Sequence, residues 1–189
     1  GVDFTKAMDE GAKAFGWKEK WKGWLKPTAV NGSKRMGVGV GVHGNADIGE
    51  DTTEAYVQLA YTGTATIFLC VAEFGTGQKS NYIKMAAEVL KIPPELIEMV
   101  PADTLVTPYE FGPVGSRGTY AIGSAVINAA EDAKKKLLEM AAPKLGASAN
   151  DLDTADGVVF VKENPSRNLK WRFLGNDQTL LGYGRFESD

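Results

Sequence analysis

The sequence predicts an α+β fold, a mixed or antiparallel sheet with packed helices. The first indication is a pair of adjacent runs, 55–61 and 64–72, that are rich in β-branched and aromatic residues. The second is helical periodicity over about 79–91 and 119–141, the latter with a stripe of small residues that permits close packing. The third is an Asp-Gly pair at 156–157, followed by an apolar run, which is typical of a β-hairpin.

Length and composition limit the class of protein. The 189 residues make up about one domain, so we expect a single partial domain over 1–189, or two small α+β subdomains within it. The net charge of −3 argues against a nucleic-acid partner, because binding phosphates requires a basic surface. One cysteine and one histidine exclude an internal disulfide framework and a Cys/His zinc cluster.

The apolar runs are short. The longest, 67–72, is far too short to span a bilayer, and the first residues show no charged and then apolar leader. We therefore expect a cytoplasmic protein with no membrane partner. Cys70 lies inside this run and is expected to be an inert core thiol rather than a nucleophile.

Residues 3–25 are expected to form an amphipathic helix that ends before Pro27. Trp17, Trp21 and Trp24 recur at helical spacing, with lysines at the intervening positions. The same pattern also fits an interfacial or nucleic-acid-binding helix. We favour the interpretation in which the tryptophans cover the core.

A glycine-rich segment follows. The alternation over 37–42 predicts a strand with one face made only of glycine, which lets another backbone or a flat ligand come close. Residues 39–44 also match G-x-G-x-x-G, but a dinucleotide site needs an apolar helix directly afterwards, and 45–50 is polar and broken by glycine. We prefer a close-packed strand, a structural role for His43 and a loop over 45–54.

Residues 73–78, the first loop, lie between a predicted buried strand and the helix 79–91. Gly75 and Gly77 free the backbone to approach a ligand, and the amides at a helix start attract anions. A plain tight turn is the alternative.

Residues 112–119, the second loop, have the same organisation and close a long loop, 101–118, of a kind that is often functional. Ser116 and Thr119 supply hydroxyls, and Arg117 supplies a planar guanidinium suited to phosphate. This pattern predicts an anion or phosphate site, with a helix cap and a solvated arginine as the alternative. Sequence spacing leaves open whether both helix starts face one cleft.

Several short motifs occur in a definite order. They are Glu73-Phe74-Gly75-Thr76-Gly77-Gln78, Ala86-Ala87-Glu88-Val89-Leu90 with Ile92-Pro93, Ala102-Asp103-Thr104, Thr107-Pro108 and Gly115-Ser116-Arg117-Gly118-Thr119. Their order and spacing, over roughly residues 5–185, resemble the molybdopterin-binding region of the xanthine dehydrogenase and aldehyde oxidoreductase family.

The resemblance implies a molybdenum cofactor site. The cofactor would be molybdopterin with molybdenum, in its cytosine dinucleotide form, and the parent enzyme would hydroxylate an aldehyde or an aromatic or N-heteroaromatic substrate with oxygen derived from water. Backbone amides would bind the cofactor, with Arg117 as a phosphate partner. Iron–sulfur clusters and FAD are expected only in partner domains or subunits, beside the remaining domains of the molybdenum subunit. The expected binding residues are Gly75, Thr76, Gly77, Gln78, Gly115, Ser116, Arg117, Gly118 and Thr119.

The chain departs from the family pattern in three ways. Many relatives have glutamine where Thr76 stands, the family's glutamate base lies in a G-x-G-E segment that nothing after Thr119 matches, and the family's subunit is several times longer. We therefore assign no catalytic and no metal-ligating residue, and expect a fragment of the C-terminal cofactor-binding region that is inactive alone. Two alternatives stay open, a reductive relative of the hydroxybenzoyl-CoA reductase type and a non-catalytic structural or interaction module.

Overall fold

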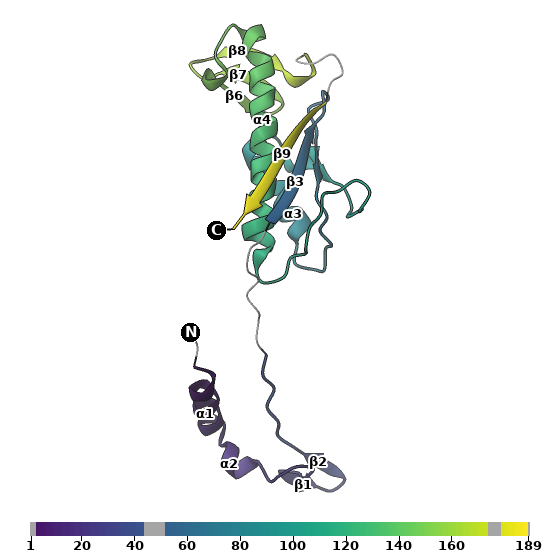
Figure 1. Cartoon of the computed structure of the whole chain (residues 1–189), viewed down its shortest axis with the longest axis vertical. Coiled ribbons are helices and arrows are strands. Elements are labelled where there is room, and N and C mark those ends of the chain that lie inside the picture. Colours follow the sequence, from purple (N-terminus) through teal and green to yellow (C-terminus); the bar gives the residue numbers. More distant parts are fainter. Residues whose placement is uncertain (1–2, 44–51, 174–178, 189) are drawn as a thin grey trace. The chain divides into compact units, whose positions relative to one another are not determined.

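The computed structural model describes residues 3–43, 52–173 and 179–188 (Figure 1). The chain divides into two compact units, residues 1–45 and 46–189.

The first unit contains two helices and a small hairpin. Helix α1 (Phe4–Phe15) is followed by the short α2 (Trp17–Lys20), and β1 (Ala29–Asn31) pairs antiparallel with β2 (Lys34–Met36). No residue between 3 and 43 is buried. This unit therefore has no hydrophobic core of its own in the part that the structure describes.

Three sequence predictions for this unit are wrong. The helix predicted over 3–25 is broken at Gly16, whose φ of 71° places it in the left-handed region and whose N–H caps α1. The tryptophans do not cover a core: Trp17 stacks on Trp21, while Trp24 is 86% exposed. The strand predicted over 37–42 is absent, because the strand before it, β2, pairs only with β1 and no ladder continues beyond Met36. The predicted loop over 45–54 lies mostly outside the described residues, and its last part, 52–54, belongs to strand β3 (Thr52–Leu59) instead.

The second unit is built on a four-stranded sheet in the order β5-β4-β3-β9. Its strands are β3 (Thr52–Leu59), β4 (Ala65–Phe68), β5 (Ile97–Met99) and β9 (Leu180–Glu187). Strand β3 pairs antiparallel with β4 and β9, whereas β4 and β5 are parallel. The mixed sheet confirms the predicted α+β class.

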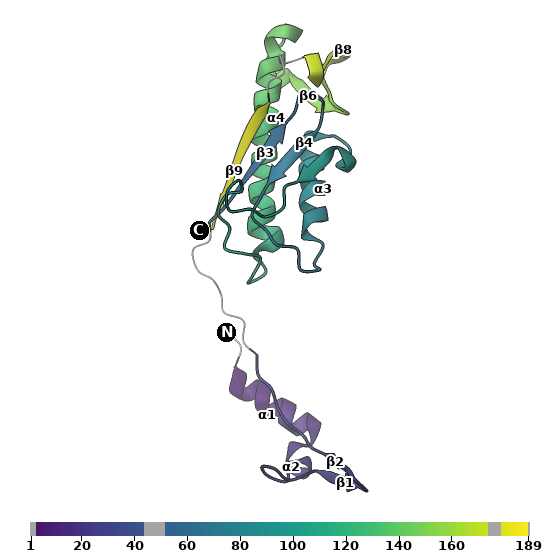
Figure 2. The same cartoon turned by 90° about the vertical axis from the view of Figure 1, so that its right-hand side faces the viewer.

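Two helices pack on this sheet. Helix α3 (Gln78–Leu90) follows the first loop, and α4 (Gly123–Leu145) follows the second through a π-helical turn, η2 (Gly118–Ile122). Helix α4 lies against β9 and β3, and α3 lies beside α4 (Figure 2). Both predicted helices are thus confirmed, with α4 ending four residues later than expected.

The contact between α4 and β9 is unusually close. An added Cβ at Gly184 would lie 2.1 Å from the carbonyl oxygen of Ala125, and one at Gly182 would lie 2.1 Å from that of Ala129. The predicted small-residue stripe on the helix therefore meets glycines on the strand, so the two backbones approach directly. Strand β9 itself was not predicted.

A second sheet and several short helical turns complete the unit. Strands β6 (Leu152–Ala155), β7 (Val158–Val161) and β8 (Asn164–Lys170) form an antiparallel sheet, and the predicted hairpin is confirmed, with φ of 49° at Asp156 and 73° at Gly157. The 3-10 turns are η1 (Pro94–Leu96), η3 (Ala149–Asp151) and η4 (Trp171–Phe173). Within the described ranges, no helix has the length and apolar character needed to cross a membrane.

Candidate functional site

The first loop folds around the carboxylate of Glu73. Its oxygens accept hydrogen bonds from the backbone amides of Gly75 (2.8 Å), Gly77 (3.1 Å) and Lys79 (3.2 Å). The glycines have φ of 99° and 74°, which a side chain would oppose, and this conformation turns their amides toward one point. The Lys79 amide, with help from the two glycine amides, lowers the pKa of the Glu73 carboxyl below its ordinary value.

This geometry changes the interpretation of the first loop. The sequence predicts that backbone amides at the start of α3 are free to bind an anionic ligand. In the structure the chain supplies that anion itself, because Glu73 accepts from the amides of Gly75 and Gly77. An added Cβ at Gly75 or Gly77 would meet nothing within 4 Å, so the outer side of the loop backbone is still open to approach.

The second loop is organised by a buried ion pair. The guanidinium of Arg117 bonds to the Glu110 carboxylate, to the carbonyl oxygen of Gly112 (2.7 Å) and to the Thr53 hydroxyl on β3 (2.5 Å). The side chains of Arg117 and Glu110 are 5% and 0% exposed. Arg117 was expected to present its charge to a phosphate, but the structure directs it inward and neutralises it.

Two hydroxyl-bearing residues of the second loop face outward instead. Ser116 and Thr119 are exposed, and in the described parts of the chain neither hydroxyl makes a hydrogen bond with protein. Ser116 has φ of 63°, a left-handed conformation that is uncommon for a residue with a side chain and is often found at functional sites. The outer face of this loop therefore offers neutral donors.

The two loops meet in space. An added Cβ at Gly118 would lie 2.9 Å from Nε2 of Gln78, and the hydroxyl of Tyr82 on α3 donates to the carbonyl oxygen of Gly118 at 3.0 Å. Burial, and then the negative charge of Glu110, raise the pKa of Tyr82 to about 12, so its phenol stays a donor across the ordinary pH range. The two loops are thus in contact with each other, which sequence spacing could not establish.

The junction also contains unsatisfied polar atoms. Oε1 of Gln78 and Oε2 of Glu110 are buried and have no hydrogen-bond partner among the residues that the structure describes. Such atoms are rare in folded proteins and mark places where a water, an ion or a ligand belongs. The π-helical turn η2 begins at this junction, and π-helical turns are frequent at functional sites.

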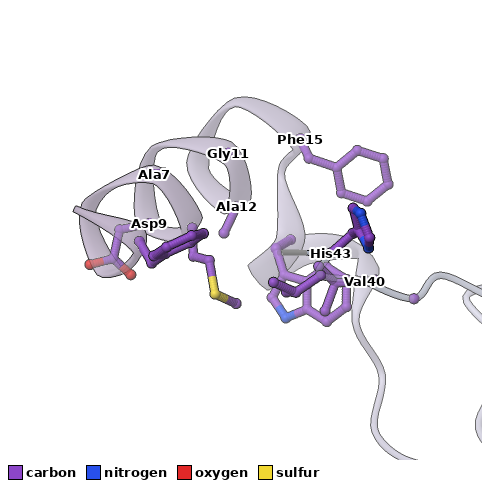
Figure 3. A pocket seen from close by; sticks show the side chains of 13 residues that line it. Ala7, Asp9, Gly11, Ala12, Phe15, Val40 and His43 are labelled. Carbon is purple, nitrogen blue, oxygen red and sulfur yellow. The ribbon is translucent and has the colours of Figure 1, made fainter. Parts of the chain in front are cut away.

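A separate hollow lies within the first unit, between α1 and residues 39–43 (Figure 3). It has a volume of about 600 Å³, and its lining is mostly apolar, with Asp9 and His43 as its ionisable residues. It contains none of the expected binding residues. Among the residues that the structure describes, no group of three or more His, Cys, Asp or Glu side chains is placed to hold a metal ion.

Sequence reasoning missed several residues of this site. Thr53, Tyr82 and Glu110 were given no role, and Glu73 was treated only as part of the first loop. Glu110 lies seven residues before Arg117 in the long loop, so the opposite charges were a usable signal. Nothing in the sequence linked Thr53 to either.

Comparison with known proteins identifies the family of this α+β fold. The family model for the molybdopterin cofactor-binding domain matches residues 10–185, so the chain belongs to that family. The probable hypoxanthine oxidase XdhD of Escherichia coli (strain K12) is 33% identical over 145 residues, which are 74% of this chain and 15% of that protein. The nicotine 6-hydroxylase large subunit of Paenarthrobacter nicotinovorans is 31% identical over 158 residues, 84% of this chain and 19% of that protein.

Solved structures show the same fold. Quinoline 2-oxidoreductase from Pseudomonas putida 86 superposes with a TM-score of 0.64 at 23% identity, over 72% of this chain and 19% of that one. CO dehydrogenase from Oligotropha carboxidovorans gives a TM-score of 0.60 at 24% identity, over 69% and 18%. The chain therefore spans about a fifth or less of the length of these relatives.

Proposed function

We propose that the chain forms part of the molybdenum-cofactor site of a molybdenum hydroxylase, an oxidoreductase that hydroxylates an aldehyde or an aromatic or N-heteroaromatic substrate. The observation that carries the proposal is the meeting of the two loops at Gln78 and Gly118. Membership of the molybdopterin cofactor-binding domain family supports the cofactor. Relatives named as a hypoxanthine oxidase and a nicotine 6-hydroxylase support an N-heteroaromatic substrate.

The residues at the junction fit a pterin cofactor with a phosphate tail. Phosphate oxygens need donors, and the exposed hydroxyls of Ser116 and Thr119 have none of their hydrogen-bonding capacity used within the described chain. The backbone beside Gly75 and Gly77 is unobstructed, since an added Cβ there would meet nothing within 4 Å. Pterin and cytosine rings carry N–H donors, which suit the unpartnered carbonyl oxygen of Gln78.

Within such a site the residues of this chain would bind and orient the cofactor. We assign Ser116, Thr119 and Gly115 to the phosphates, with Thr76 and Gln78 closing the other side and the buried Gly118 joining the two loops. Arg117 would act through the shape of the second loop rather than by direct contact, because its guanidinium is buried against Glu110. When bound, the molybdenum centre supplies the oxygen-transfer and electron-accepting chemistry.

The finer parts of the proposal concern the form of the cofactor and the partners. We propose the cytosine dinucleotide form, and electron transfer to iron–sulfur clusters and FAD in partner domains or subunits. The relatives include a protein named as a dehydrogenase complex subunit and others named as molybdenum-binding or large subunits, which supports partners of this kind. We propose a cytoplasmic location.

The test is to purify the 189-residue chain from cells that make molybdenum cofactors and to assay bound molybdenum and pterin. We expect stoichiometric pterin, with CMP released on acid hydrolysis if the dinucleotide is the cytosine form. The variant Ser116→Ala with Thr119→Ala should lose most of the pterin, whereas Ser124→Ala, five residues after Thr119 and inside α4, should keep it. A wild-type chain that carries no pterin would contradict the proposal for this chain.

A further inference from the structure

The ion pair between Glu110 and Arg117 ties the second loop at both ends. Oε1 of Glu110 accepts from the Gly112 amide (3.1 Å) as well as from Arg117, and Arg117 returns a hydrogen bond to the Gly112 carbonyl oxygen (2.7 Å). The same guanidinium reaches Thr53 on the central strand β3. One buried cluster therefore closes the loop on itself and fastens it to the sheet.

Stability alone is a weak reason for this cluster. Both side chains are almost completely withdrawn from water, at 5% and 0% exposure, and the desolvation of two charges offsets much of their attraction. Oε2 of Glu110 is buried without a partner, which adds to the cost. Apolar side chains of similar volume can often replace a buried ion pair without loss of stability.

The ion pair instead fixes the backbone conformation of the second loop. Arg117 points inward, so its neighbour Ser116 faces outward, in a left-handed conformation that a free loop would rarely keep. Gly118 is buried against Gln78 directly after it, so the pair also sets where the second loop meets the first.

We propose that Glu110 and Arg117 are positioning residues, whose buried ion pair holds the second loop in the conformation that presents Ser116 and Thr119 to a ligand. This inference rests on the proposed function for its meaning, since the ligand is the proposed cofactor. The geometry of the loop can nevertheless be measured without any ligand.

The first measurement is hydrogen–deuterium exchange across residues 112–119 in the 189-residue chain. The variant Glu110→Leu with Arg117→Met replaces the pair by apolar side chains. We expect exchange in the second loop to become about tenfold faster or more, while the melting temperature changes little. Thr53→Val, which removes only the tether to β3, should give a smaller increase in the same amides. Glu88→Leu with Lys91→Met, at an exposed ion pair on α3, is the matched control and should leave the second loop unchanged.

The second measurement is the affinity for cytidine 5′-diphosphate by isothermal titration calorimetry. The wild-type chain should bind it, and the apolar double variant should bind it about tenfold more weakly. If exchange rises in the double variant but the wild type does not bind the nucleotide, the positioning role stands and the proposed function fails. Unchanged exchange over 112–119 would overturn the positioning role. Loss of the folded state in the double variant would also overturn it, because the pair would then serve stability.

Discussion

The two loops hold their backbones in opposite ways. The first loop gathers its amides around an exposed carboxylate, Glu73, which is an anion the chain carries itself. The second loop is closed from within by a buried ion pair and leaves its hydroxyls outside. Both segments place glycines before a helix, but they differ in which hydrogen-bonding groups stay available to a ligand.

This difference teaches that a glycine-bearing turn does not by itself define an anion site. Only the donors that make no hydrogen bond within the chain are available to a ligand. In the first loop the amides of Gly75 and Gly77 are already used, whereas in the second the exposed hydroxyls of Ser116 and Thr119 are not. We therefore expect the second loop to supply most of the anion contacts.

The largest effect should come from disturbing the packing of α4 on β9, because α4 follows the second loop and also packs beside α3, which follows the first. In Gly184→Ala the new Cβ would lie 2.1 Å from the Ala125 carbonyl oxygen and 2.2 Å from the Ala129 nitrogen, so helix and strand must separate. We expect a loss of about 3 kcal/mol in the free energy of unfolding, measured by urea denaturation. Leu181→Ala, on the exposed face of the same strand, should cost much less. A wild-type unfolding curve for Gly184→Ala would refute the close contact.

The next effect concerns the buried ion pair, which only the second loop has. Glu110→Gln leaves the Arg117 charge buried without its partner, and we expect a loss of about 3 kcal/mol that changes little with salt, because buried charges are poorly screened. Denaturation at low and high ionic strength measures this. Glu88→Gln, at an exposed pair, should have almost no effect, and any effect should fade as salt is added.

A smaller effect is expected where the loops touch. In Gly118→Ala the new Cβ would crowd Nε2 of Gln78 at 2.9 Å, but that side chain is flexible and can move. We expect a loss of about 1 kcal/mol and a shift of the Gln78 side-chain amide signals by NMR. Gly11→Ala, where an added Cβ meets nothing within 4 Å, is the control. Unmoved Gln78 signals in Gly118→Ala would mean that the loops are not coupled there.

The smallest effect concerns acid. Amide donors lower the pKa of Glu73 in the folded chain, so the stabilisation that its carboxylate gives is present above its ordinary pKa of 4.5. It is lost as the pH falls through the lower, folded value. The amide signals of Gly75 and Gly77 should therefore move together in an NMR pH titration, with a midpoint below 4.5. Glu73→Gln should abolish the transition, and a midpoint at or above 4.5 would contradict the hydrogen bonds from the loop amides to Glu73.

The sequence predicted the elements whose signals are local. Helices α3 and α4, strands β3 and β4 and the hairpin at Asp156 all follow from periodicity and turn residues. Strand β9 is not predicted from the sequence because Gly182 and Gly184 weaken strand propensity. The strand accommodates these glycines because α4 packs closely on them. Long-range pairing of this kind leaves no local trace.

The candidate site was predictable to the same extent. Both loops could be located from glycines before helices, yet the roles within them depended on partners far away in the chain. Arg117 donates a hydrogen bond to Thr53, which lies more than sixty residues earlier in the chain, and no spacing rule links the two residues. A charged residue in a loop was read as exposed because charged residues usually are.

The register of β9 has a consequence for how the protein is made. Thr52 stands opposite Glu187, so the central strand of the sheet waits for a segment that the ribosome delivers long after it. Until then, β3 has an open edge and the alanine face of α4 is bare. An open strand edge and an uncovered apolar helix face both favour association with other chains, so this region is exposed to misassociation until β9 has been made.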